Sequence, residues 1–219
     1  MSLHGSVRSA PSGAKGFDSD TVLSLQVAQQ FANQRYDFCI RYLSLGAGQA
    51  PGDLSTQEAN NILSTGLALM PVQHVRASGW QPNTALGQED GSHAVMNTQA
   101  IGFPAKVNVW CDLEGVSGAA TVDDVANYCN AWYSAVSSAG YLPGLYVGSE
   151  AGLTSQQLYD LSFQHYWQSC STVPVVAVRG YQMVQTFVAD PVNGIGIDDD
   201  LTQTDSEGGQ AQWLIRKRS

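Results

Sequence analysis

Short apolar runs alternate along this chain with longer amphipathic stretches, and this alternation limits the fold more than any other feature. A strand that is followed by a helix and then by another strand pairs in parallel, because the helix carries the chain back across the sheet. The sequence therefore predicts an α/β layer fold. The eight strands that we expect cover residues 15–20, 38–44, 67–75, 107–114, 142–149, 164–170, 180–186 and 194–201.

The helical patterns are regular in the first half of the chain and fade in the second. We expect helices over residues 23–34, 55–66, 90–102, 121–140 and 154–163. The later segments "STVPVVAVRG" and "FVADPVNG" are too short and too rich in Pro and Gly for crossover helices. Eight strands with few late helices indicate a compact (β/α)₈ TIM barrel over residues 15–219, after a flexible tail over residues 1–14. A doubly wound open sheet is the alternative, but no G-x-G-x-x-G or P-loop favours it.

The segment "VNVWCDLE" (107–114) ends in two acids. Residues two apart share one face of a strand, and the odd-numbered positions 107–113 are all apolar. These positions suit the side that packs against helices. Asp112 and Glu114 should then point to the barrel interior, at the carboxyl end of the strand.

The first and last expected strands carry acids in the same arrangement. In "KGFDSD", Phe17 suits the helix side, which turns Asp18 inward; in "GIGIDDDL", Ile197 suits the helix side, which turns Asp198 and Asp200 inward. Three strands would then deliver acids to one rim, and the carboxyl-terminal rim is where TIM barrels place their active sites.

Carboxylates that crowd into a partly buried mouth raise one another's pKa values. A protonated acid beside an ionised carboxylate is what glycoside hydrolysis requires. A metal site is the competing use of such acids, but the sequence has no His ligand motif, so we expect neither a metal nor a cofactor.

Composition excludes other classes of protein. The net charge is −9 and the chain has no basic stripe, which argues against nucleic-acid binding. No apolar run reaches the ~20 residues of a membrane helix, so we expect no membrane partner. The four cysteines form no C-x-x-C pair and are expected to be buried free thiols.

Four segments carry a resemblance to known proteins. "KGFDSD", "AIGFPAKVNVWCDLE", "GLYVGS" and "MVQTFVADPVNGIGIDDDL" occur in this order over about residues 15 to 203. In order and spacing they resemble the bacterial glycoside-hydrolase-like TIM-barrel domains of unknown function. More distantly, the chain is similar to the family 25 glycoside hydrolases, which are lysozymes that cleave peptidoglycan.

The resemblance implies a role for each acid. Glu114 matches the proton donor to the leaving-group oxygen, and Asp112 matches the carboxylate that stabilises an oxazolinium or oxocarbenium-like state. Asp18 matches the acid that lines the sugar site. Asp198 or Asp200 matches the acid of the last strand.

The resemblance further implies a monomeric glycosidase that acts on an N-acetylated polysaccharide, with peptidoglycan as the expected partner. It favours a secreted, periplasmic or cell-wall location over a cytoplasmic one. A non-catalytic glycan-binding or accessory barrel remains the alternative. Further candidates for substrate contacts lie near the expected mouth, although packing roles explain several of them equally well: His74, Trp80, Tyr146, Trp167, Gln168 and Gln185.

Overall fold

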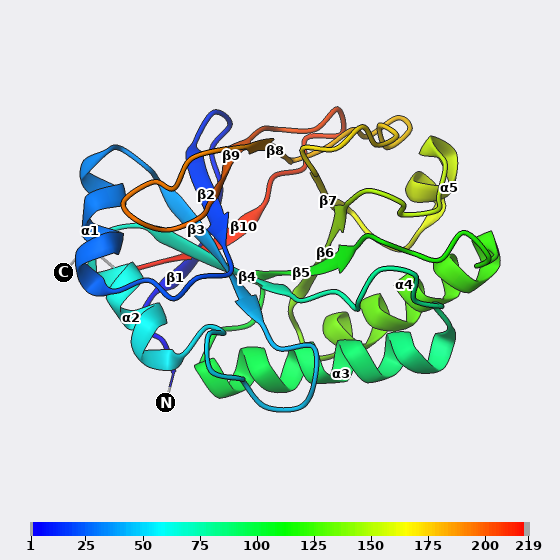
Figure 1. The fold of residues 1–219 in the computed structure, drawn as a ribbon, viewed down its shortest axis with the longest axis horizontal. Helices are drawn as coiled ribbons and strands as arrows, with labels where there is room; N and C mark the ends of the chain where they lie inside the picture. The colour runs from blue at the N-terminus through cyan, green and yellow to red at the C-terminus, as the bar shows by residue number, and fades with distance from the viewer. Residues whose placement is uncertain (1, 217–219) are drawn as a thin grey trace.

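The computed structural model describes residues 2–216. Eight of its strands pair in the closed order β4-β3-β2-β9-β8-β7-β6-β5 and back to β4, which confirms the eight-stranded barrel. Helices flank this ring (Figure 1). The eight strands are β2 (Lys15–Ser19), β3 (Phe38–Leu43), β4 (Ala68–Gln73), β5 (Asn108–Leu113), β6 (Leu142–Val147), β7 (His165–Gln168), β8 (Met183–Phe187) and β9 (Asp198–Thr202).

All five expected helices are present. They are α1 (Leu25–Asn33), α2 (Thr56–Ser64), α3 (Thr84–Ile101), α4 (Val122–Ser138) and α5 (Ser155–Asp160). Helix α3 starts earlier than the expected residue 90, because the side chain of Asn83 accepts a hydrogen bond from the backbone N–H of Leu86 and caps the helix there. Among the described residues, no helix follows α5, and none is long and apolar enough to cross a membrane.

Strand β9 runs antiparallel to both of its neighbours, β2 and β8, whereas the strand–helix pattern predicted parallel pairing throughout. Residues 188–197 connect β8 to β9, and Asn193 and Gly194 adopt positive φ angles in this loop. The loop is too short for the crossover that a parallel strand needs, so β8 and β9 form a hairpin. Consequently β9 begins, rather than ends, at the rim where β2 ends.

The N-terminal segment is part of the sheet, in contrast to the flexible tail expected over residues 1–14. Strand β1 (Ser6–Ser9) pairs antiparallel with β10 (Gln212–Ile215), and Leu214 of β10 lies opposite Leu69 of β4. Strands β4 and β5 pair only through Val72 and Gln73 on the β4 side. The barrel wall is therefore open between their amino-terminal halves, and β10 lines β4 there.

Aromatic rings fill the lower barrel. Trp110 and Trp167 lie within it with their ring centroids 5.9 Å apart, and Phe38 packs nearby in the same cluster. Glycine makes room for two of these rings: a Cβ at Gly144 would lie 2.3 Å from Trp110, and one at Gly16 would lie 2.4 Å from Phe38. Because the lower barrel is packed with apolar groups, polar chemistry is confined to the mouth.

Candidate active site

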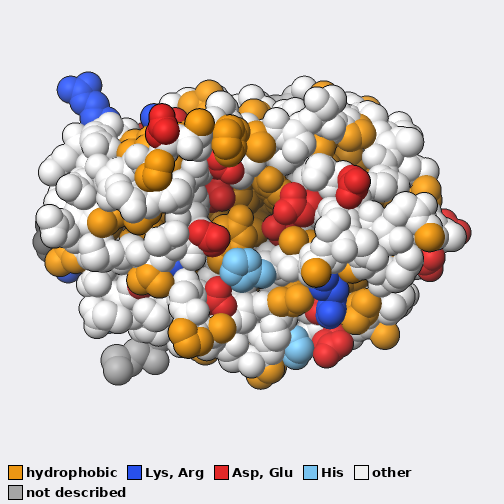
Figure 2. All heavy atoms as spheres, in the orientation of Figure 1, with side chains coloured by type: hydrophobic (Ala, Val, Ile, Leu, Met, Phe, Trp, Pro, Cys, Tyr) orange, Lys and Arg blue, Asp and Glu red, His pale blue; other side chains and the backbone are white. Residues whose placement is uncertain are grey.

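A cleft of about 420 Å³ opens at the carboxyl ends of the parallel strands. Figure 2 shows a hollow in the middle of the visible face, with acidic side chains around it and a histidine beside it. The cleft is lined by Asp18, Ser19, Asp20, Tyr42, His74, Val75, Asp112, Glu114, Phe187, Val188, Gly196, Ile197 and Asp198.

Four of the expected acids meet in this cleft. Asp18 lies near the end of β2, Asp112 lies in β5, Glu114 follows β5 directly, and Asp198 begins β9. Asp200 lies deeper: it is 1% exposed and stands opposite Gly16. Because β9 runs antiparallel, the acid nearer the rim is the first of the run rather than the last.

Asp18 is held by an ordered set of hydrogen bonds. Gln185 donates from Nε2 to Oδ2 of Asp18 at 2.8 Å, and Tyr146 donates its hydroxyl to Oε1 of Gln185 at 2.9 Å. Tyr42 donates to Oδ1 of Asp18 at 3.4 Å. Burial raises the pKa of Asp18 to about 7, and the charge of Asp198 adds to this rise, although the bond from Gln185 opposes it. This carboxyl group therefore holds a proton near neutral pH.

Asp200 is buried below the cleft, near enough to Asp18 for the charge of Asp18 to act on it. Burial, and then the charge of Asp18, hold the pKa of Asp200 well above its ordinary range. Trp167 donates from Nε1 to Oδ1 of Asp200 at 2.8 Å, while Oδ2 of Asp200 has no hydrogen-bond partner among the described residues. Trp167 is thus a buried support for Asp200 and not an exposed sugar platform.

Asp112 and Glu114 differ in burial. Asp112 is 6% exposed, and burial together with the charges of Glu114 and Asp18 raises its pKa well above the ordinary value. Glu114 is half-buried, and burial raises its pKa as well. Oδ1 of Asp112 has no hydrogen-bond partner among the described residues. Both carboxyl groups therefore hold their protons to a higher pH than an exposed carboxyl group does.

Trp80 lies behind the cleft and not across it. Its side chain is 8% exposed, packs edge-on against Tyr128 and donates from Nε1 to the backbone oxygen of Glu114 at 2.9 Å. The exposed sugar-stacking position expected for Trp80 is therefore absent from the structure. Gln168 is half-buried at the end of β7 and does not line the cleft.

His74 is at the cleft edge as part of a small network. Its Nε2 lies 2.9 Å from Oδ1 of Asp53, and its ring stacks on Tyr42 with centroids 4.5 Å apart. Sequence reasoning missed two further lining aromatics, Tyr42 and Phe187, and the latter is 66% exposed. Strict alternation along residues 38–43 places Tyr42 on the inward face with Phe38, so this signal was available.

The chemistry of the cleft follows from its charges. Neither Lys nor Arg lines it, so its carboxyl groups are balanced by protons and not by cationic side chains. Within residues 2–216, no three His, Cys, Asp or Glu side chains are grouped so that they could hold a metal ion. The cleft is suited to donate a proton and to stabilise a positive charge that develops on a bound molecule.

Sequence comparison identifies one family. The family described as "Rv2525c-like, glycoside hydrolase-like domain" matches residues 29–202. None of the curated proteins matches this chain.

Three solved structures illustrate the similarity of fold. An uncharacterized protein from B. stearothermophilus has 19% identity and a TM-score of 0.66, with 87% of this chain and 96% of that chain covered. The Tat-secreted protein Rv2525c of Mycobacterium tuberculosis, in complex with L-tartrate, has 15% identity and a TM-score of 0.65, covering 88% and 96%. The modular autolysin LytC of Streptococcus pneumoniae, in complex with a synthetic peptidoglycan ligand, has 11% identity and a TM-score of 0.59, covering 92% and 52%.

Proposed function

Because this chain belongs to the Rv2525c-like, glycoside hydrolase-like family, we propose that it hydrolyses glycosidic bonds in an N-acetylated cell-wall polysaccharide, with peptidoglycan as the substrate. One observation carries the proposal. Asp112 and Glu114 line the same cleft as Asp18, whose carboxyl group holds a proton near neutral pH. The similarity of fold to an autolysin that was solved with a peptidoglycan ligand supports this substrate class.

In the proposed reaction, Glu114 gives its proton to the oxygen of the leaving sugar. Its raised pKa suits this role, because the acid must be protonated near the working pH. Asp112 faces the positive charge that develops as the bond breaks. When the substrate's own N-acetyl oxygen attacks the sugar carbon, this charge lies on an oxazolinium ring, whose N–H donates to Asp112.

The raised pKa of Asp112 makes this role depend on contacts with the substrate. An N-acetyl N–H that donates to Oδ1, which has no partner among the described residues, would stabilise the ionised form of Asp112. The positive charge of the oxazolinium would stabilise it further. Substrate binding thus lowers the pKa of Asp112, so that Asp112 is ionised and Glu114 keeps the proton that it donates.

The same observation favours a second candidate function. If bound glycan left Asp112 protonated, Asp112 would remain a neutral hydrogen-bonding group and would not support a cationic intermediate. The barrel would then bind N-acetylated glycan without cleaving it.

We further propose a secreted or cell-wall-associated location. The substrate lies outside the cytoplasm, and one protein of similar fold is Tat-secreted.

Two measurements on wild-type protein separate the two functions. In the first, the protein is renatured in a gel that contains purified peptidoglycan, and cleared bands report hydrolysis. In the second, it is sedimented with insoluble peptidoglycan, which reports binding. Clearing together with sedimentation supports the enzyme, and sedimentation without clearing supports the binding module. If the protein neither clears the gel nor sediments with peptidoglycan, both functions are contradicted.

A further inference from the structure

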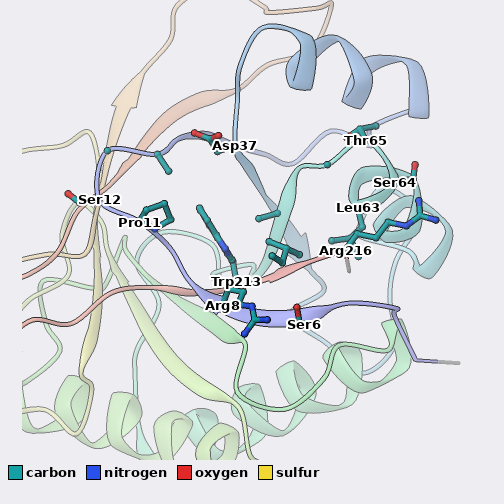
Figure 3. Close-up of a pocket in the computed structure, with 15 residues that line it drawn as sticks. Ser6, Arg8, Pro11, Ser12, Asp37, Leu63, Ser64, Thr65, Trp213 and Arg216 are labelled. Atoms are coloured by element: carbon teal, nitrogen blue, oxygen red, sulfur yellow. The ribbon is translucent and has the colours of Figure 1, made fainter. Parts of the chain in front are cut away.

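A second and larger cavity lies at the opposite end of the barrel. Its volume is about 1190 Å³, and it is formed where β1, β10 and the end of α2 meet the starts of β3 and β4. Figure 3 shows Trp213 in the middle of this cavity, with Pro11 and Ser12 toward one end and Ser64 and Arg216 toward the other. The proposed active site is at the carboxyl ends of the same strands, so the two sites do not overlap.

The pairing of β1 with β10 builds one wall of this cavity. Ser6 lies opposite Ile215, and Arg8 lies opposite Trp213. Side chains of directly opposed residues share a face of the sheet, and residues two apart along a strand share it too. All four residues therefore face the same side, and all four line the cavity.

The cavity carries positive charge on a strongly acidic protein. Arg8 and Arg216 line it, are exposed, and form no ion pair with any residue in the described range 2–216. Asp37 is the acid in its lining, and Oδ2 of Asp37 already accepts the backbone N–H of Lys15 at 3.2 Å. The protein as a whole has a net charge of −9, and the two arginines, which have no ion-pair partner among residues 2–216, form a local basic patch on it.

Trp213 provides an independent observation. Its side chain is only 6% exposed and packs on Phe38, with ring centroids 5.4 Å apart. The Nε1 of Trp213 forms no hydrogen bond in the described part of the chain and is not a fully buried atom, so its N–H is free to donate to a molecule in the cavity. The hydroxyl groups of Ser6 and Ser12 also lack partners there. The cavity thus contains several hydrogen-bond donors that have no acceptor among the described residues.

The remaining polar groups of the lining are already satisfied. Ser64 donates its hydroxyl to the backbone oxygen of Asn61, and Thr65 donates to that of Ile62. These bonds partly cover the carbonyl groups at the carboxyl end of α2, where partial negative charge would otherwise repel an anion. The cavity as a whole therefore selects for a ligand rich in anionic oxygens.

We propose that this cavity is a second binding site, which takes an extended, hydroxylated polymer that carries phosphodiester or carboxylate groups. Arginine pairs with either group through two parallel hydrogen bonds, and Trp213 Nε1, on the strand opposite Arg8, supplies a further donor. A cavity of about 1190 Å³ exceeds the needs of a single ion and suits several units of a chain. The site would hold an anionic wall polymer at one end of the barrel while the acidic cleft works at the other.

Titration calorimetry with three oligomers of matched length tests the proposal: a glycerol-phosphate hexamer, a galacturonate hexamer and neutral maltohexaose. We expect one or both anionic chains to bind and the neutral chain not to bind. Binding of the phosphate chain alone, or of the carboxylate chain alone, identifies which oxyanion the site accepts. Affinity should fall as salt is added, because the contacts are charged. If neither anionic chain binds, or if maltohexaose binds equally well, the proposal is wrong.

Variants locate the binding. The double variant Arg8→Ala/Arg216→Ala should weaken binding about 100-fold, because hydrogen bonds to charged groups are lost. Trp213→Phe keeps the ring on Phe38 but removes the N–H, and should weaken binding about tenfold. Arg35→Asn is the control: Arg35 is an exposed arginine at positive φ that does not line the cavity, and Asn tolerates that backbone conformation.

Two results would overturn the assignment to this cavity. One is an Arg35→Asn variant that weakens binding as much as the double variant does, which would indicate a general charge effect. The other is a Trp213→Phe variant that binds as tightly as wild type. Glu114→Gln should bind the anionic oligomers like wild type, so this test is independent of whether the cleft is catalytic.

Discussion

Gly148 lies directly against Glu114: a Cβ at Gly148 would be 2.4 Å from Cβ of Glu114 and 2.7 Å from its Oε2. Only glycine allows the Glu114 side chain to occupy its observed position. The second glycine of the run "GLYVGS" is Gly148, and its lack of a side chain leaves room for the carboxyl group of Glu114.

We expect Gly148→Ala to displace the Glu114 carboxyl group while the barrel still folds. A displacement of about 1 Å at a reacting group can cost about 100-fold in rate, so the rate of glycan hydrolysis should fall by roughly that factor. Gly118→Ala is the control, since a Cβ there meets nothing within 4 Å. Thermal unfolding reports whether both variants fold. Unchanged activity in folded Gly148→Ala would show that the position of Glu114 does not matter.

A substitution at Trp80 distinguishes between two roles for this residue, support of Glu114 and direct binding of sugar. Trp80→Phe removes the hydrogen bond to the backbone oxygen of Glu114 but keeps an aromatic ring against Tyr128. One such bond contributes about 1 kcal/mol, so kcat should fall a few-fold to about tenfold while KM stays close to the wild-type value. A rise in KM with unchanged kcat would instead support the stacking role that the sequence suggested.

Asp18 should make stability depend on pH. Its pKa is about 7 in the folded protein and 3.8 ordinarily, so between these values the folded state holds a proton that the unfolded state releases. Stability conferred by this proton is complete below about pH 4 and is lost as the pH rises toward 7, by about 1.4 kcal/mol per pH unit. The midpoint of thermal unfolding should therefore drop between about pH 5 and about pH 8.

Asp18→Asn should reduce this pH-dependent drop in the midpoint of thermal unfolding, because asparagine does not titrate. The substitution also removes a negative charge that raises the pKa of Asp200. Circular dichroism melts at the two pH values measure the effect. Asp190→Asn, at an exposed loop position, should show the full wild-type drop. An equally large drop in Asp18→Asn would mean that Asp18 is already ionised in the folded protein at low pH.

The rate of hydrolysis should depend on pH with a bell shape. Glu114 must carry a proton, so kcat/KM falls as the pH rises through its raised pKa. Asp112 must be ionised, so kcat/KM also falls on the acid side, and the raised pKa of Asp112 in the free protein moves this limb upward from the ordinary carboxyl range. Initial rates on a soluble glycan fragment across the pH range give the profile. A profile without an alkaline limb would contradict general acid catalysis by Glu114.

The sequence was most informative where one rule applied, namely that residues two apart share one face of a strand. Alternation along residues 107–114 places Val109, Cys111 and Leu113 in the outer apolar layer, and the structure has them there. The same rule turned Asp18 and Asp112 toward the mouth. Gln185 was a candidate because it lies near the end of an expected strand, and in the structure it donates to Asp18.

The remaining features depend on contacts that are distant in sequence. The direction of β9 follows from the length of one loop, whereas Asp198 and Asp200 point inward in either direction. Strand β1 pairs with β10 at the far end of the chain, so the first residues alone carry little signal for it. Trp80 lies in a Gly-rich loop that reads as exposed, but its indole N–H finds a carbonyl group behind the cleft.

The proposed reaction depends on Glu114 as the general acid. The most direct test of this role counts the new reducing ends that the protein releases from purified peptidoglycan. Glu114→Gln keeps the shape of the side chain but removes the transferable proton. General acid catalysis contributes about 10²–10⁴-fold, so release by Glu114→Gln should fall by that factor while the protein still sediments with peptidoglycan. Glu89→Gln, on the exposed face of α3, should release reducing ends at the wild-type rate. Release by Glu114→Gln at the wild-type rate would contradict the account.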